Sequence, residues 1–193
     1  MRKLLVLLCL AGFCFGVPSA ANIEKAKKEC EGGNAASCAM VSEAYYYGEG
    51  IKQDDVKAFE YAKKGCEGGD AISCGDVGAA YHKGEGVKHD FLKAFEYYQK
   101  GCGGGDMEAC YKIGNLYKYG FGVEQNHTKA FEYYKKGCDG GGAMGCATIG
   151  TLYESGIGGV EEDINKTLEF YGKACDLKYL LACEAYERVK SGK

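Results

Sequence analysis

Apolar residues recur at helical spacing along this chain, in a pattern that repeats every 36 or 37 residues. In each repeat, two aliphatic or small residues and a tyrosine form the apolar stripe of a first short helix, A: Val41, Val77, Ile113 and Ile149; Ala44, Ala80, Leu116 and Leu152; Tyr45, Tyr81, Tyr117 and Tyr153. A second stripe predicts a helix B: Ala58, Ala94, Ala130 and Thr167; Phe59, Phe95, Phe131 and Leu168. The pattern therefore predicts a pair of one-sided helices in every repeat.

Glycines separate these helices and also interrupt helix A. A Gly-x-Gly turn joins A to B in each repeat, and the additional Gly159 accounts for the single 37-residue step. Gly78, Gly114 and Gly150 fall in the middle of helix A, where glycine costs about 1 kcal/mol relative to alanine. We expect these three glycines to mark a close approach between two helix backbones.

Ten of the cysteines form five pairs with partners eight residues apart: Cys30 and Cys38, Cys66 and Cys74, Cys102 and Cys110, Cys138 and Cys146, Cys175 and Cys183. Along one straight helix such partners would lie about 12 Å apart, beyond the roughly 7 Å that a disulfide spans. The chain must therefore reverse between them. Glycines in four of the five intervening segments can end helix B, and Asn34, Asp70 and Asp106 can cap the next helix.

Zinc is the alternative role for paired cysteines. Structural zinc sites use thiolates two to four residues apart, commonly with histidines nearby. His82, His89 and His127 have no regular relation to the cysteines. The spacing favours one disulfide per helical hairpin, and we predict no metal and no cofactor.

The repeats predict a single all-α domain over residues 22–193, a right-handed α/α solenoid of ten short helices. We divide it into a half-repeat 22–33, repeats 34–69, 70–105, 106–141 and 142–178, and a capping helix 179–190. One hairpin cannot bury its apolar face alone, so neighbouring repeats must stack. We expect a monomer.

Residues 1–21 differ from the repeats and predict a signal peptide. Arg2 and Lys3 precede an almost wholly apolar segment, residues 4–17. Cleavage after Ala21 leaves small residues at the required positions, and Gly16 offers a second site. Neither Cys9 nor Cys14 follows the small residue that lipoprotein processing requires. We expect a secreted or periplasmic protein, where disulfides persist.

Charge and hydropathy exclude two classes of partner. Without Arg2 and Lys3, 22 basic residues face 27 acidic ones, which makes nucleic acid an unsuitable partner. No later segment approaches the roughly 20 apolar residues that a membrane span needs.

The segment VGAAYHKGEGVKHDFLKAFEYYQKG, residues 77–101, resembles a Sel1-like repeat. With one C-x7-C pair per repeat, the chain is similar to the Helicobacter cysteine-rich proteins. That resemblance implies a weak β-lactamase or penicillin-binding activity. The residues do not support it, because no serine after the signal peptide begins a Ser-x-x-Lys motif and neither companion motif is present. The sequence assigns no catalytic residue.

Binding without chemistry is the function that we favour from the sequence. One face of helix A varies among the repeats at positions i, i+3 and i+7: Met40, Glu43 and Tyr47; Asp76, Ala79 and Lys83; Lys112, Asn115 and Tyr119; Thr148, Thr151 and Ser155. Neutral drift on a solvated face is one explanation. The other is a groove that binds a protein or a peptidoglycan-derived ligand, with Tyr47 and Tyr119 as anchors.

Two Asn-x-Thr sequences raise the prospect of glycosylation. Asn126 and Asn165 each have an acidic residue two positions earlier, as in the extended acceptor of bacterial N-glycosylation. We place both in loops between helices A and B. A cap of helix B is the alternative role for Asn165.

Overall fold

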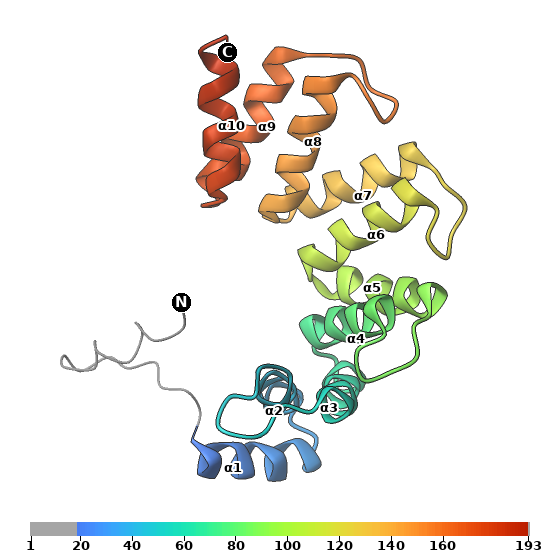
Figure 1. Cartoon of the computed structure of the whole chain (residues 1–193), viewed down its shortest axis with the longest axis vertical. Coiled ribbons are helices and arrows are strands. Elements are labelled where there is room, and N and C mark those ends of the chain that lie inside the picture. The colour runs from blue at the N-terminus through green and yellow to red at the C-terminus, as the bar shows by residue number, and fades with distance from the viewer. Residues whose placement is uncertain (1–18, 193) are drawn as a thin grey trace, which may run out of the picture.

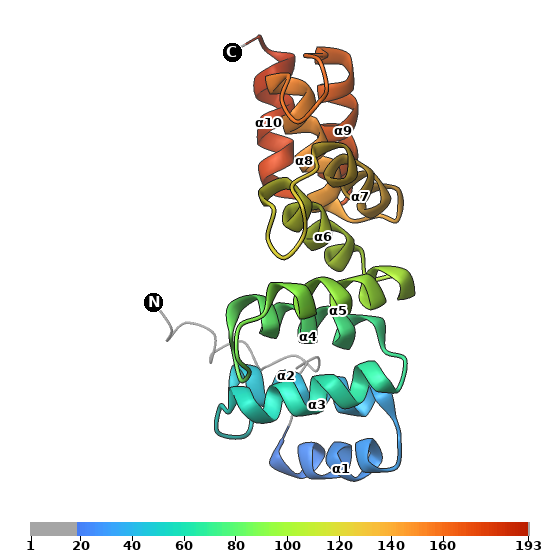
Figure 2. The same cartoon turned by 90° about the vertical axis from the view of Figure 1, so that its right-hand side faces the viewer.

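The computed structural model describes residues 19–192, which form ten helices and no strand. The helices are α1 (Ala20–Glu31), α2 (Ala35–Tyr47), α3 (Asp55–Glu67), α4 (Ala71–Lys83), α5 (Phe91–Gly104), α6 (Met107–Tyr119), α7 (His127–Asp139), α8 (Ala143–Ser155), α9 (Ile164–Asp176) and α10 (Leu180–Lys190). They stack in chain order along an arc, with α1 and α10 at opposite ends (Figures 1 and 2). The predicted all-α solenoid is confirmed.

Four A/B hairpins make up the arc: α2 with α3, α4 with α5, α6 with α7, and α8 with α9. Helix α1 is the leading B helix and α10 the closing A helix. Helix α1 begins at Ala20, so the predicted cleavage after Ala21 would fall in its first turn. The rest of the predicted signal peptide, residues 1–18, lies outside the described residues. None of the ten helices is both long and apolar enough to cross a bilayer.

Short polar side chains fix where the helices begin. The side chains of Asn34, Asp70 and Asp106 accept hydrogen bonds from backbone N–H groups in the first turns of α2, α4 and α6, as predicted. The B helices α3, α5, α7 and α9 begin in the same way at Asp54, Asp90, Asn126 and Asp163.

The five predicted disulfides close the turns between successive helices B and A. Their Cα atoms lie 4.5 to 4.7 Å apart. A left-handed glycine makes the reversal in the first four turns, as at Gly33 with φ 91°. Lys178, with φ 68°, takes this conformation in the fifth turn, which contains no glycine.

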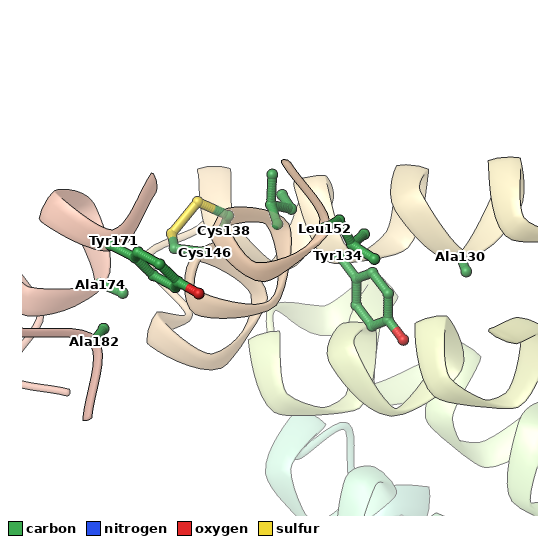
Figure 3. Close-up of a cluster of buried hydrophobic side chains, with 9 residues drawn as sticks. Ala130, Tyr134, Cys138, Cys146, Leu152, Tyr171, Ala174 and Ala182 are labelled. Carbon is green, nitrogen blue, oxygen red and sulfur yellow. A yellow bond between two sulfur atoms is a disulfide. The ribbon is translucent and has the colours of Figure 1, made fainter. Parts of the chain in front are cut away.

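The mid-helix glycines contact an aromatic ring and not a second backbone, which corrects the sequence prediction. A Cβ atom added at Gly78 or Gly150 would lie 2.6 Å from a ring carbon of Tyr98 or Tyr171. Gly114 lies against the ring of Tyr134 in the same way. These rings are the largest buried groups in their repeats, and Figure 3 shows two of them beside the Cys138–Cys146 disulfide.

The first repeat departs from this arrangement at both positions. Ser42 stands where the later repeats have glycine, and Ala62 stands where they have the buried tyrosine. The Ser42 hydroxyl donates a hydrogen bond of 2.9 Å to the carbonyl oxygen of Ala58. The space between α2 and α3 therefore lacks an aromatic ring that the other three hairpins contain.

A second set of aromatic contacts joins one repeat to the next. The ring of Tyr81 meets Phe59 of the preceding repeat edge-on at 5.3 Å and stacks on Tyr97 of its own repeat at 5.6 Å. Tyr117 and Tyr153 make the equivalent pairs of contacts. Such contacts contribute about 0.5–1.5 kcal/mol beyond the area that they bury. They align the four hairpins into one body.

Reduction of the disulfides should unfold the chain or lower its melting temperature by tens of degrees. Each nine-residue loop contributes about 2.6 kcal/mol by constraining the unfolded chain. Thermal melting followed by circular dichroism, with and without reductant, measures the effect. A sample alkylated without prior reduction is the control, and superimposable melting curves would contradict the prediction.

Candidate functional site

An open groove of about 400 Å³ lies between α2 and α4. Side chains of α3, α5 and α6 complete its walls. The helices that line it lie toward the amino-terminal end of the arc, where Figure 1 labels α2 and α4.

The floor of the groove is formed where the first repeat lacks its tyrosine. Ser42, Ala58 and Ala62 line it, and the Phe59 ring and Ala79 extend its apolar surface. In the three later repeats a tyrosine ring occupies the position of Ala62. The floor of the groove therefore lacks the ring that the later repeats have at this position.

The structure brings together half of the variable helix A positions that the sequence singled out. Six of them line the groove: Glu43, Tyr47, Asp76, Ala79, Lys83 and Lys112. The other six lie outside it: Met40, Asn115, Tyr119, Thr148, Thr151 and Ser155. The grouped residues come from α2, α4 and the first half of α6.

Two of the excluded residues hold the buried tyrosines in place. Asn115 accepts a hydrogen bond of 2.8 Å from the Tyr134 hydroxyl. Thr151 lies 3.0 Å from the Tyr171 hydroxyl, which also donates to Glu154 at 2.7 Å. Asn115 and Thr151 occupy equivalent positions in their repeats. They differ in residue type, but each pairs with the hydroxyl of the equivalent buried tyrosine.

The groove carries more negative than positive charge. Five carboxylates line it, from Glu43, Asp55, Asp76, Glu85 and Glu108, against the ammonium groups of Lys83 and Lys112. Both lysines are already paired, Lys83 with Glu85 and Lys112 with Glu108, each at 3.3 Å. Glu43 and Asp76 form no ion pair within residues 19–192.

Asp76 is the carboxyl most affected by this environment. Its side chain is exposed to the groove, but the groove walls displace much of the surrounding water, and this desolvation raises its pKa to about 6. The negative charges of Glu43 and Asp106 raise the pKa further. A positive group placed beside Asp76 would relieve both effects.

Two polar groups at the groove make no hydrogen bond in the described part of the chain. Tyr98 is only 2% exposed, and its hydroxyl makes no hydrogen bond, because Ala79 stands where Asn115 and Thr151 serve the other tyrosines. The Nδ1 atom of His82 is also buried and unpaired. Burial and the positive charge of Lys112 lower the pKa of His82.

Ser42, Ala62 and Tyr98 are not among the site residues that the sequence predicts. Alignment of the repeats could have identified Ser42 and Ala62. They replace the glycine and the tyrosine of a pair that recurs in the other three repeats. Only the structure shows that the two positions touch the same space, and that His82 and Tyr98 lie beside it.

The serine hydroxyls serve the fold. Ser37 donates a hydrogen bond of 2.8 Å to Glu29, and Ser42 donates to Ala58. Ser73 is fully buried without a partner. Nothing in this arrangement resembles an activated nucleophile. The described residues also contain no cluster of side chains suited to a metal ion.

The two predicted glycosylation sites differ in their surroundings. Asn126 ends an A-to-B loop and caps α7. Asn165 lies in the first turn of α9 and not in a loop, and Asp163, not Asn165, is the cap. Thr167 of the same acceptor is buried, with its hydroxyl donating to Asp163 at 2.8 Å. Modification of Asn165 would therefore require this turn to open.

Comparisons with known proteins agree with the repeat pattern. The Sel1 repeat model matches residues 35–70, 71–106, 108–142 and 143–179. Cysteine-rich protein B of Helicobacter pylori is 30% identical, and the match covers 69% of this chain and 99% of that one with a TM-score of 0.53. No match is found among curated protein sequences.

Two further solved structures share the fold. A Sel1 repeat protein from Oxalobacter formigenes is 24% identical over 86% of this chain and 74% of its own, with a TM-score of 0.74. A protective antigen of uropathogenic Escherichia coli is also 24% identical, over 89% of this chain, with a TM-score of 0.77. This chain spans only 37% of that antigen.

Substitution of Asp76→Asn should stabilise the folded chain at pH 7.5. The raised pKa means that ionisation of Asp76 opposes folding above pH 6. Because both the folded and the unfolded chain bind this proton at low pH, the effect should shrink as the pH falls toward 4. Thermal melting of both proteins across this pH range tests the prediction. A melting temperature that falls at pH 7.5, or a gain that is the same at pH 4, would contradict it.

Proposed function

Because this chain belongs to the Sel1 repeat family, we propose that it is a binding scaffold that takes up a segment of a partner protein in the groove between α2 and α4. The disulfide-linked hairpins hold the groove in a fixed shape before the partner arrives. Since such disulfides persist in an oxidising compartment, we place this activity outside the cytoplasm, in the periplasm or the extracellular medium.

The proposal rests mainly on one observation, the replacement of a repeated core contact by small side chains at the floor of the groove. A scaffold with no further role could keep the glycine–tyrosine pair in every repeat. In the first repeat Ser42 and Ala62 replace it, and six of the twelve variable helix A positions line the groove beside them. Loss of a buried ring reduces packing, so a binding role gives this departure a reason.

The rim of the groove suits a protein segment. The rings of Tyr46 and Tyr47 meet edge-on at 4.9 Å beside the opening, and Tyr47 is 67% exposed. Tyrosine is favoured at binding hot spots because it offers a large contact area with little loss of conformational freedom.

Selection from a displayed library of random dodecapeptides tests the proposal. We expect the oxidised protein to enrich peptides whose binding is lost, by at least about tenfold in affinity, on substitution of Tyr47→Ala. Tyr119→Ala is the matched control, because Tyr119 occupies the equivalent position two repeats later, is 54% exposed and lies outside the groove.

The two variants should have the same circular dichroism spectrum as the parent chain. Enrichment of no peptide, or of peptides that bind the Tyr47 variant as well as the parent, would overturn the proposal. Muropeptides added as competitors distinguish a cell-wall ligand, since displacement by them would assign the groove to that class and not to a protein segment.

A further inference from the structure

We propose that the segment bound in the groove is cationic, with a lysine or arginine side chain facing Glu43 and Asp76 and an adjacent aromatic side chain in the space beside Ala62. This inference rests on the proposed function and specifies the chemistry of the partner. Three independent features of the groove lead to it: its unneutralised charge, the unpaired hydroxyl of a largely buried tyrosine that lines it, and its apolar floor.

The charge favours a cation. Glu43 and Asp76 face the same hollow from α2 and α4, and neither has a basic partner among residues 19–192. The two lysines of the groove already pair with Glu85 and Glu108. An ammonium or guanidinium group between Glu43 and Asp76 would make charge-assisted hydrogen bonds to carboxylates that now repel each other. An acidic segment would meet the same repulsion.

The Tyr98 hydroxyl is the second feature. Tyr134 and Tyr171, its equivalents, both have hydrogen-bond partners. Tyr98 is just as deeply buried and lines the groove, but the methyl group of Ala79 replaces the side chain that would pair with it. A donor on the bound segment would satisfy the Tyr98 oxygen, as an N–H group of the same cation could do.

The floor is the third feature and concerns the neighbouring side chain. In repeats two to four, a ring lies against helix A at the position where the first repeat has Ala62. The groove extends to this position, where Phe59, Ala58 and Ala62 give it apolar walls. An aromatic ring from the partner would therefore occupy the place that the chain's own tyrosine occupies elsewhere, with favourable burial of its surface.

The peptides selected through Tyr47 provide the test. We expect them to share a lysine or arginine close to an aromatic residue. Each is resynthesised with norleucine for lysine or citrulline for arginine, and its affinity is measured by fluorescence polarisation. Loss of the charge should weaken binding to the parent protein at least about tenfold. Replacement of the aromatic residue by alanine should have an effect of similar size.

Matched double variants of the protein locate the effect. Glu43→Gln with Asp76→Asn should weaken the charged peptides at least about tenfold and leave the neutral ones unchanged. Glu96→Gln with Glu132→Gln removes the same charge from exposed positions on α5 and α7 outside the groove. This control should change affinity by less than about twofold, and Tyr98→Phe should weaken the charged peptides without altering the fold.

The outcomes separate this inference from the proposed function. Peptides that need Tyr47 but contain no basic residue, or that bind equally well with norleucine, would overturn the cationic partner and leave the groove as a binding site. Equal losses in the two double variants would show that net charge and not this pair of carboxylates attracts the peptides, which also overturns it. Failure to select any peptide that depends on Tyr47 would overturn both.

Discussion

Packing of a helix B tyrosine against a helix A glycine is the contact on which each regular repeat depends. A glycine in the middle of a helix costs about 1 kcal/mol, whereas burial of a large side chain contributes roughly 1.5–3 kcal/mol. The exchange is therefore favourable wherever both residues are present, as for Gly78 with Tyr98. Any side chain at the glycine would push the ring away and separate the two helices.

The other repeated features lie in the two turns that flank helix B. A disulfide holds the turn that follows helix B, and left-handed glycines shape the turn that precedes it. The second glycine of that turn also lets the chain lie against the preceding repeat, because a Cβ atom at Gly122 would lie 2.7 Å from the backbone of Phe91. Local constraints of this kind let a chain of short helices adopt one defined shape without a single large core.

The same repetition decides how much could be predicted from the sequence. The stripe residues, the caps at Asn34, Asp70 and Asp106, and the five disulfides were all predictable because each has a local cause that recurs. The role of Gly78 was not, because the partner that it contacts lies 20 residues away on another helix. A glycine in the middle of helix A indicated a close contact at that position. The periodicity of helix B did not show that the contacting group is the ring of Tyr98.

The candidate site was predictable only as a set of variable positions on helix A. Those positions divided in the structure, since Asn115 and Thr151 bond to buried tyrosines while Glu43 and Asp76 face the groove. The two groups of positions do not differ in residue type. They differ in which neighbouring side chains or spaces they face. The functional site of this molecule is best sought where one repeat differs from the others. The first repeat differs at both members of the glycine–tyrosine pair, with Ser42 and Ala62 in their place.

Restoring that pair is the most direct measurement of this account. The double variant Ser42→Gly with Ala62→Tyr should fold with the same helical circular dichroism, melt several degrees higher, and lose the peptides that bind through Tyr47, because the new ring would occupy the floor of the groove and direct its hydroxyl toward Glu43. A variant that melts at a lower temperature, or that still binds those peptides with the affinity of the parent chain, would contradict the claim that the missing ring creates the site.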